Sequence, residues 1–379
     1  MSKKKPKLLI FITEDWYFWI HWVSLAKGAR DSGYEVQIAT RVTKHKALIE
    51  REGLKVIPLR LIRRSKNIFN ELFSILEIIK IYRKERPDLV HHISVKPILY
   101  GSLAAKIAGV KKIVNTLPGL GVLFVNNDFR ALMLRNIVKI AYFMAFFSKS
   151  SRVIFQNKED LKLFVESKIV SSKKAILIRG VGVNIFKFKY TQEHSSTPIV
   201  VLASRMLWNK GVGELVEAAR KLRKRSVECR IVLVGVPDPE NPMSIDEDTL
   251  KSWNDEGAVE WWGYREDMPK VLSEANIVVL PTTYGEGLPT ILLEAASCGR
   301  AIIATNVPGC KEIVRHEENG LLVPVGNSEF LIASLCLLIG DQDLRKRMGI
   351  CGRKIAEEEF SVEKIVAETV LVYEGLLSR

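Results

Sequence analysis

The chain has 379 residues, 47% of them hydrophobic, and a formal net charge of +14 at neutral pH. This length and apolar content predict two ordinary domains, each with its own core, and exclude a disordered protein. No stretch reaches the roughly 18 uncharged residues that a membrane-spanning helix requires. The apolar run near the start is broken by Glu14 and Asp15, so we expect no secretory segment. The five cysteines lack CxxC spacing, which favours reduced, inert thiols in the cytosol.

The charge is unevenly distributed along the chain. Residues 1–190 hold 36 Lys and Arg against 14 Asp and Glu, a net charge of +22, whereas residues 191–379 hold 21 against 29, a net charge of −8. A field of this kind favours an anionic partner such as nucleic acid, acidic lipid headgroups or a phosphorylated substrate. The alternative is a surface whose charge only aids solubility.

Short apolar runs alternate with helix-length segments through the first half. The predicted strands are residues 7–13, 35–40, 55–59, 89–94, 112–117, 152–157 and 175–181. This alternation is typical of βα units on a parallel sheet. Continuous apolar character within each run indicates strands that are buried on both faces.

A polar stretch at residues 186–198 predicts a linker, and a second series of strands follows it. These are residues 198–205, 230–235, 259–264, 276–282, 301–306 and 320–326. The sequence therefore predicts two doubly wound α/β domains, residues 1–185 and 199–359, with a ligand site in a cleft between them. Residues 360–379 form a last segment with helical spacing, which begins near Ser361, a plausible N-cap, and follows no strand.

Two glutamates stand in the stretch YGEGLPTILLEAASCG at residues 284–299. Glu286 follows a predicted strand and lies in a glycine-rich turn, and Pro289 suits the first turn of a helix. The backbone N–H groups of Gly287 and Leu288 then lie at the positive end of this helix, where phosphate is the expected ligand.

The carboxylate of Glu286 repels a phosphate at contact distance, so we expect it to accept hydrogen bonds from the hydroxyls of an adjoining sugar. Glu294 lies about two turns further on, where its carboxylate can hold a vicinal diol such as that of a ribose. In the alternative interpretation, Glu286 only favours the helix dipole and Glu294 is exposed.

The stretch SRMLWNKG at residues 204–211 follows another predicted strand. Arg205 and Lys210 lie on the loop after that strand, at the edge of the sheet where the glutamate loop is also expected. Two cations there can neutralise a diphosphate. A solvated basic loop is the alternative.

These motifs together resemble the retaining, metal-independent GT-B glycosyltransferases of family four, whose hallmark is an E-x7-E motif in the C-terminal domain. The resemblance covers most of the chain and rests on EGLPTILLE, SRMLWNKG, RGVGVNIF at 179–186, GRAIIATNVPGCKEIV, NGLLVPVGN and the FSVEKIV tail. It implies that Arg205 and Lys210 bind the donor diphosphate, that Glu286 contacts the transferred sugar and that Glu294 holds the ribose. It also implies that the last helix crosses back to the first domain.

Such an enzyme needs no metal and no cofactor beyond the nucleotide sugar itself, because the cations and the helix N-terminus stabilise the charge that develops on the leaving phosphate. The DxD-like string Asp246-Glu247-Asp248 lies in a polar loop, and we interpret it as surface rather than as a metal site.

The acceptor side departs from the family. Relatives often carry a histidine after the fifth strand of the first domain, where this chain has NTLPGLG at 115–121, so no general base is assigned. Five residues are the candidate acceptor contacts: Asp15, His92, Lys96, Gly119 and Gly121. For His92 an ordinary strand histidine is the alternative.

Two stretches of the basic half, residues 62–84 and 129–149, are both apolar and cationic. Such helices can lie among lipid headgroups, and plain packing on the sheet is the alternative. The candidate membrane contacts are Arg63, Arg64, Arg130, Arg135 and Lys139. The chain is similar to bacterial members that act on polyprenyl-diphosphate-linked sugars in O-antigen or glycan assembly and commonly transfer N-acetylhexosamines, with UDP as the expected nucleotide. We therefore expect a peripheral enzyme on the cytoplasmic face of the inner membrane.

Other functions stay open. Nucleotide-sugar epimerases and sugar-phosphate synthases share the double-domain architecture. A nucleic-acid-binding protein would also be basic, but the chain shows no helix-turn-helix or aromatic RNA motif, so we expect no nucleic acid partner. A sensor that binds a nucleotide sugar without turnover is a third alternative.

Overall fold

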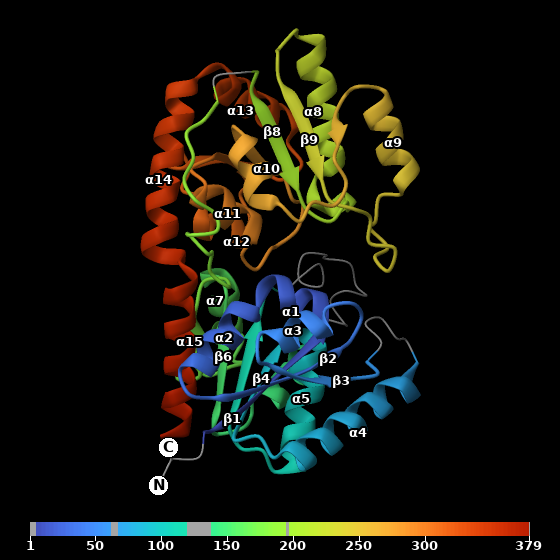
Figure 1. Cartoon of the computed structure of the whole chain (residues 1–379), viewed down its shortest axis with the longest axis vertical. Helices are drawn as coiled ribbons and strands as arrows, with labels where there is room; N and C mark the ends of the chain where they lie inside the picture. Colours follow the sequence, from blue (N-terminus) through green and yellow to red (C-terminus); the bar gives the residue numbers. More distant parts are fainter. Residues whose placement is uncertain (1–4, 62–66, 120–137, 195–196, 379) are drawn as a thin grey trace. The chain divides into compact units, whose positions relative to one another are not determined.

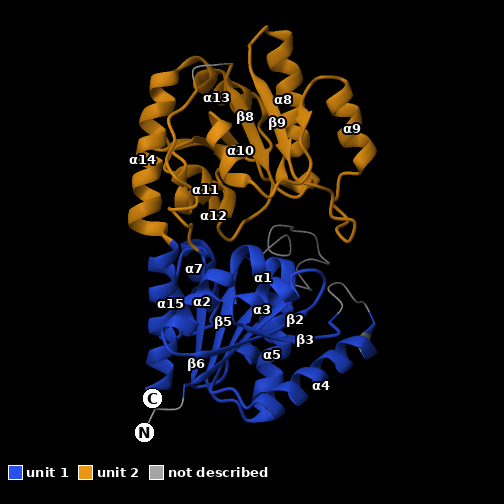
Figure 2. Ribbon diagram, in the orientation of Figure 1, with its two compact units in different colours: residues 1–181, 362–379 blue, residues 182–361 orange. Residues whose placement is uncertain are grey.

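The computed structural model describes residues 5–61, 67–119, 138–194 and 197–378, with only the backbone of Ile68. Its contacts divide the chain into two compact units (Figure 2). Unit 1 comprises residues 1–181 and 362–379, and unit 2 comprises residues 182–361. Each unit is an α/β domain built on one parallel sheet (Figure 1).

Unit 1 holds a sheet of seven parallel strands among its described residues. In spatial order they are β3 (Lys55–Pro58), β2 (Glu35–Arg41), β1 (Lys7–Glu14), β4 (Leu89–Ile93), β5 (Ile113–Leu117), β6 (Ser151–Phe155) and β7 (Ala175–Leu177). All seven strands are parallel, but β2 and β3 are added on one side of β1, whereas β4 to β7 are added on the other side, so the strand order reverses between β1 and β4. Ligands of open parallel sheets bind at the carboxyl ends of strands at such a reversal.

Helices cover both faces of this sheet. They are α1 (Asp15–His21), α2 (Val23–Asp31), α3 (Lys46–Arg51), α4 (Ile68–Glu85), α5 (Val95–Ala108), α7 (Lys158–Glu166) and α15 (Val362–Leu377), and residues 138–145 are also helical. Alternate residues of β1 point to opposite faces, so Leu8 packs in the core with α2 and α15, whereas Leu9 packs in the core with α4 and α5. The helix at 138–145 lies on the α5 side, where Tyr142 packs with Phe155.

The last helix, α15, belongs to unit 1 although its sequence follows the whole of unit 2. It packs on α2, and a methyl group of Val366 lies so close to Gly28 that a Cβ there would be 2.2 Å from it. The hydroxyl of Tyr373 is 2.7 Å from Nδ1 of His91 on β4, inside the core. Through these contacts α15 buries one face against unit 1, although no strand precedes it directly in the sequence.

Unit 2 holds six parallel strands among its described residues. In spatial order they are β10 (Glu260–Trp261), β9 (Arg230–Val234), β8 (Ile199–Ala203), β11 (Ile277–Leu280), β12 (Ala301–Thr305) and β13 (Gly320–Val323). The helices are η2 (Trp208–Lys210), α8 (Val212–Lys224), α9 (Glu247–Asp255), α10 (Met268–Glu274), α11 (Thr290–Ser297), α12 (Pro308–Ile313), α13 (Ser328–Gly340) and α14 (Gln342–Phe360). The strand order of this sheet reverses between β8 and β11.

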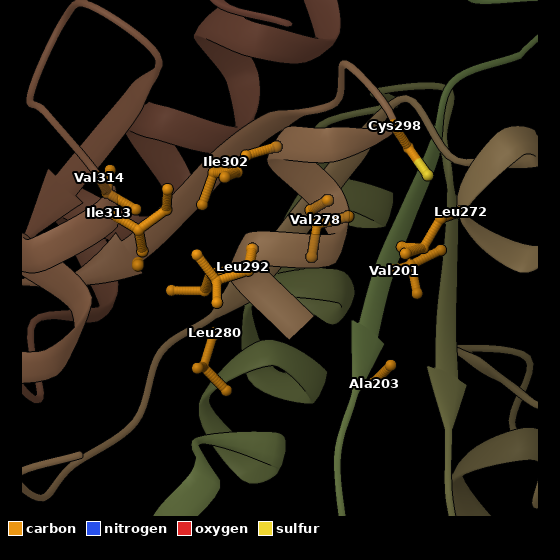
Figure 3. Packing of buried hydrophobic residues seen from close by; sticks show 14 of the residues in the cluster. Val201, Ala203, Leu272, Val278, Leu280, Leu292, Cys298, Ile302, Ile313 and Val314 are labelled. Carbon is orange, nitrogen blue, oxygen red and sulfur yellow. The ribbon is translucent and has the colours of Figure 1, made fainter. Parts of the chain in front are cut away.

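The two faces of the second sheet have separate cores. Val201 on β8, Val278 on β11 and Leu292 on α11 belong to one of them, and Figure 3 shows their side chains gathered between the strands and the helix. Val200 and Val279, each next to one of these in sequence, pack in the other core with α8 and α13. This alternation explains why every strand reads as a continuous apolar run.

All thirteen strands expected from the sequence are present, and most are one to three residues shorter than their apolar runs. The predicted α/β fold with two doubly wound sheets is confirmed. The last helix begins at Val362, directly after Ser361.

Candidate functional site

The predicted donor residues come together at the point where the strand order of unit 2 reverses. Lys210 ends η2, in the connection from β8 to α8, and Glu286 lies in the loop between β11 and α11. Strands β8 and β11 are neighbours and parallel, so both loops leave the same edge of the sheet. This is the position at which doubly wound sheets bind their ligands.

Lys210 and Glu286 form a close ion pair between Nζ and Oε1. Both side chains are largely buried, at 13% and 11% exposure. The hydroxyl of Thr282 donates to the same oxygen of Glu286 at 3.2 Å, and Nζ of Lys210 lies 5.1 Å from the centre of the Tyr284 ring. Two residues of the loop between β11 and α11 therefore hold Lys210: Glu286 by its charge and Tyr284 by its aromatic face.

The electrostatic surroundings keep Lys210 protonated. Burial by itself opposes the charge, but Glu286 and then Tyr284 outweigh it and raise the pKa of the ammonium group. Burial, followed by the charge of Glu286, also raises the pKa of Tyr284. The site thus presents a fixed cation and a neutral phenol.

Arg205 lies in the same cluster, because its charge acts on the phenol of Tyr284. Its guanidinium group is 2.5 Å from Oδ2 of Asp238, and 38% of the arginine side chain is exposed. Sequence reasoning missed Asp238. It follows the end of β9, the strand beside β8, and that position is the signal that could have indicated it.

Two glycines let the loops of the site approach each other. A Cβ on Gly211, where φ is +77°, would lie 2.1 Å from the carbonyl oxygen of Pro281. A Cβ on Gly309, at the start of α12, would lie 2.3 Å from the carbonyl oxygen of Gly287. Only glycine fits such contacts, so the backbones of the η2, glutamate and α12 loops are packed tightly together.

The predicted helix start is close to the observed one. Helix α11 begins at Thr290, with Pro289 in the N-cap position, and Gly287 and Leu288 precede it. Leu288 is 7% exposed and belongs to the core.

Glu294 lies on α11 and is half-buried, so the alternative of an exposed residue does not hold. Its carboxyl group has no hydrogen bond or ion pair with any residue in the described part of the chain, and Lys187 acts on it only through its charge. Burial raises the pKa of Glu294 to about 7, and Lys187 partly opposes this. A half-buried carboxyl group without a partner is costly unless a ligand satisfies it.

The residues predicted to contact an acceptor lie in unit 1, and two of them are buried. Asp15 follows β1 at the reversal of the strand order, but its carboxylate accepts hydrogen bonds at 2.8 and 2.9 Å from the backbone N–H groups of Thr43 and His45. It also accepts from the hydroxyl of Thr43. Burial opposes ionisation, but these hydrogen bonds lower the pKa of Asp15. We correct its assignment: the side chain holds the loop after β2 and does not face an acceptor.

His92 is also a correction. It is fully buried on β4, with Nε2 2.9 Å from the hydroxyl of Tyr82 and Nδ1 2.8 Å from Oδ1 of Asn115. Burial lowers the pKa of His92 to about 4, so the imidazole stays neutral. This is the ordinary strand histidine of the alternative interpretation.

The structure describes only some of the other candidate residues of unit 1. Lys96 follows β4 at the reversal of strand order and pairs with Glu71 at 2.8 Å. Gly119, with φ of +126°, follows β5, and Lys139 lies on the helix at 138–145. Five candidates lie outside the described residues: Arg63, Arg64, Gly121, Arg130 and Arg135.

The DxD-like string has a structural role. Asp246 is the N-cap of α9, and it accepts hydrogen bonds from the backbone N–H and the hydroxyl of Thr249 at 2.7 and 2.9 Å. Within the described ranges, no three His, Cys, Asp or Glu side chains are grouped so that they could hold a metal ion. Among the described residues, no helix has both the length and the apolar character that crossing a bilayer requires.

Comparisons with known proteins agree with this geometry. A family described as "Glycosyl transferase 4-like" matches residues 7–157, and one described as "Glycosyl transferases group 1" matches residues 197–341. The N,N'-diacetylbacillosaminyl-diphospho-undecaprenol alpha-1,3-N-acetylgalactosaminyltransferase of Campylobacter jejuni is 29% identical, over 92% of each chain. The UDP-Gal:alpha-D-GlcNAc-diphosphoundecaprenol alpha-1,3-galactosyltransferase of Escherichia coli is 24% identical over 305 residues, which cover 77% of this chain and 76% of that protein.

Solved structures share the fold. A glycosyltransferase from Rickettsia africae superposes with a TM-score of 0.79 at 21% identity, covering 99% of both chains. The Anabaena protein HepE, crystallised with UDP and glucose, superposes with a TM-score of 0.78 at 19% identity, covering 97% of this chain and 99% of its own. The fold is GT-B, as the resemblance implied. The two family matches cover the first and second halves of the chain, and the Lys210–Glu286 pair lies where the strand order of the second sheet reverses. The chain belongs to the glycosyltransferases.

Proposed function

We propose that the chain is a retaining glycosyltransferase that moves an N-acetylhexosamine from a UDP-linked donor to a polyprenyl-diphosphate-linked saccharide. The whole-length relatives in Campylobacter jejuni and Escherichia coli are named for transfer to undecaprenol-diphosphate-linked sugars, which supports this acceptor class over an epimerase or a sugar-phosphate synthase. The observation that carries the proposal is the buried Lys210–Glu286 pair between the ends of β8 and β11.

In this proposal Lys210 and Arg205 bind the donor diphosphate. The bond between the anomeric carbon and the diphosphate oxygen breaks, negative charge grows on that oxygen, and the two cations stabilise it most where it is greatest. The acceptor hydroxyl forms its new bond on the face that the diphosphate leaves, and its proton passes to a diphosphate oxygen. No general base from the protein is then required.

The acids beside the cations hold them in position before the donor arrives. Glu286 holds the ammonium group of Lys210, and in our assignment its carboxylate also accepts hydrogen bonds from hydroxyls of the transferred sugar. Arg205, which is more exposed, can turn from Asp238 toward a phosphate. The fixed cation avoids the cost of reorganising the site during the reaction.

Glu294 completes the proposed donor site. Its half-buried carboxyl group, which has no partner among the described residues, suits the two hydroxyls of a ribose, and it lies on the helix that follows the Glu286 loop. Gly287, Leu288 and Pro289, before the first turn of α11, bring the positive end of that helix to the diphosphate in the same proposal.

Unit 1 is the proposed side for the acceptor and for an anionic membrane surface. Exposed apolar side chains follow helical spacing on α4, at Phe69, Leu72, Phe73 and Leu76, and on the segment 138–147, at Ile140, Phe143, Met144 and Phe147. Lys96 and the five basic membrane candidates, Lys139 among them, belong to the same basic half. Apolar stripes with nearby cations favour attachment to anionic lipid, and the cytoplasmic face of the inner membrane is the proposed location.

The decisive test measures transfer from UDP-N-acetylgalactosamine to a short polyprenyl-diphosphate-linked sugar. Lys210→Ala removes a cation that stabilises the leaving diphosphate, and Glu286→Gln removes the charge that holds Lys210 and weakens the proposed contact with the sugar. Each should lower the rate by about 100-fold or more. Lys221→Ala and Glu329→Gln, which break an exposed ion pair elsewhere in unit 2, are matched controls and should keep the rate within about 2-fold.

Near-normal transfer by both site variants would overturn the assignment. A chelator should leave the rate unchanged, and a loss that Mn²⁺ restores would contradict a metal-free clamp. Slow hydrolysis of the donor without acceptor would exclude the sensor that binds without turnover.

A further inference from the structure

A second pocket lies in unit 1, between the end of α5 and the segment 138–150. Its volume is about 430 Å³, within the range of roughly 300–1,000 Å³ that is usual for small-molecule sites. It adjoins Ile113 and Ser150, at the starts of β5 and β6. It is therefore at the opposite edge of the sheet from the carboxyl ends, where the acceptor candidates lie, and the proposed transfer does not use it.

Three lysines line this pocket. Lys106 comes from α5, Lys111 from the connection to β5 and Lys149 from the segment before β6. None of the three forms an ion pair with a carboxylate among the residues that the structure describes, and none of the described residues that line the pocket is Asp or Glu. All three lysines are exposed, and each contributes a positive charge to the lining of this one cavity.

The ends of two helices partly oppose this charge. Helix α5 ends at Ala108, and the helix at 138–145 ends beside the pocket, so carbonyl ends of both helices are close. Each contributes the equivalent of about half a negative charge. Three full positive charges outweigh about one negative charge, and the pocket remains selective for anions.

The outer side of the pocket is apolar. Met144 and Phe147 line it and are 66% and 70% exposed. Leu103 and Ile107 on α5, close in sequence to Lys106, are also about half exposed. A ligand with both a phosphate and acyl chains satisfies the two halves of this surface, whereas free phosphate satisfies only the lysines.

We propose that this pocket binds the phosphate of one anionic phospholipid through Lys106, Lys111 and Lys149, while the acyl chains lie along Met144 and Phe147. The choice of ligand rests on the membrane attachment proposed above, but the pocket is separate from the donor site. One lipid held at a fixed place would set the orientation of unit 1 on the bilayer surface.

The experiment uses the full chain and short-chain lipids below their micelle concentration. Isothermal titration with dihexanoyl-phosphatidylglycerol should show one saturable site. The triple variant Lys106→Ala, Lys111→Ala, Lys149→Ala should weaken it by about 10-fold or more. The control variant Lys44→Ala, Lys162→Ala, Lys173→Ala removes the same charge from other exposed positions of unit 1 and should stay within about 2-fold.

Three results would overturn the proposal: no binding by the intact chain, equal binding by the pocket triple variant, or equally tight binding of glycerol 3-phosphate or inorganic phosphate, which would mark a free-phosphate site. A separate measurement tests the membrane attachment. Phe69→Ser with Phe73→Ser on α4 should reduce sedimentation with phosphatidylglycerol vesicles and leave the short-chain lipid titration unchanged, because neither residue lines the pocket.

Discussion

Glu286, in the loop before α11, and Glu294, on α11, have different electrostatic surroundings. Glu286 is paired with a lysine, whereas the carboxyl group of Glu294 has no partner among the described side chains, and burial raises its pKa to about 7. The same residue type is therefore paired with a cation at one position and titrates near neutral pH at the other.

The proposed ribose contact of Glu294 predicts a pH-dependent affinity. Ribose hydroxyls donate to the ionised form, so binding of UDP-N-acetylgalactosamine should become tighter as pH rises through 7. At pH 6 about one tenth of the carboxyl groups are ionised, and binding should be up to about 10-fold weaker than at pH 8. Titration calorimetry at both values measures this, because the diphosphate diester does not itself titrate in that range.

The variant Glu294→Gln is the control for this pH dependence. It should bind the donor with an affinity that no longer changes between pH 6 and 8. An intact protein whose affinity is also flat would show that Glu294 does not receive the diol.

The buried histidines of β4 predict sensitivity to acid. Burial lowers the pKa of His91 to about 3, with a further contribution from the charge of His92, whose own pKa is about 4. The unfolded chain binds protons near pH 6.5 and the folded chain does not, so stability falls as pH falls below 6.5. Each histidine contributes about 1.4 kcal/mol per pH unit in that window.

Urea denaturation at pH 7.5 and at pH 5 measures the effect. His91→Gln should make the dependence of unfolding free energy on pH shallower by about one proton. His194→Gln, at an exposed position in unit 2, should leave it unchanged. Equal slopes in the His91 variant and the intact chain would contradict the burial that we describe.

At the scale of elements, α15 joins unit 1 through close helix packing. Gly28 on α2 leaves room for Val366, and Tyr373 reaches His91. The sequence showed a helix with no strand beside it, and the family resemblance implied its return. Periodicity cannot identify the surface that such a helix covers, because its apolar face fits any complementary groove.

This packing predicts opposite effects of two Gly→Ala changes. Gly28→Ala should destabilise the chain by about 1–3 kcal/mol, since the new methyl group overlaps Val366. Gly375→Ala on α15 meets open space and should be neutral or stabilise by up to about 1 kcal/mol. Urea denaturation compares them, and Gly28→Ala combined with Val366→Ala should recover part of the loss. Equal stability of the two single variants would disprove the close contact.

At the scale of the whole molecule, the charge separation predicts salt-sensitive membrane binding. Residues 1–190 carry a net charge of +22, and the exposed stripe of α4 lies within them. Binding to phosphatidylglycerol vesicles should weaken steadily between 0.05 and 0.5 M salt, as the Debye length becomes shorter than about 10 Å. Cosedimentation measures the bound fraction.

Exposed phenylalanines of unit 2 give the matched control. Phe69→Ser with Phe73→Ser should weaken vesicle binding by about 10-fold or more, since each ring loses its apolar burial. Phe186→Ser with Phe330→Ser removes rings of similar exposure from unit 2 and should have little effect. A bound fraction that changes neither with salt concentration nor with the content of anionic lipid would contradict the proposed membrane attachment.

The sequence by itself determined the strands, their grouping into two sheets, the donor loops and the separation of charge. Strand periodicity and loop chemistry are local, so 276–282 and 284–299 already indicated a strand, a turn and a helix at the site. Only the tertiary structure decided which polar side chains remain accessible. Asp15 is satisfied by Thr43 and His45, and His92 by Tyr82 and Asn115, at separations of 10 to 30 residues. Burial depends on such distant partners, and no local pattern encodes them.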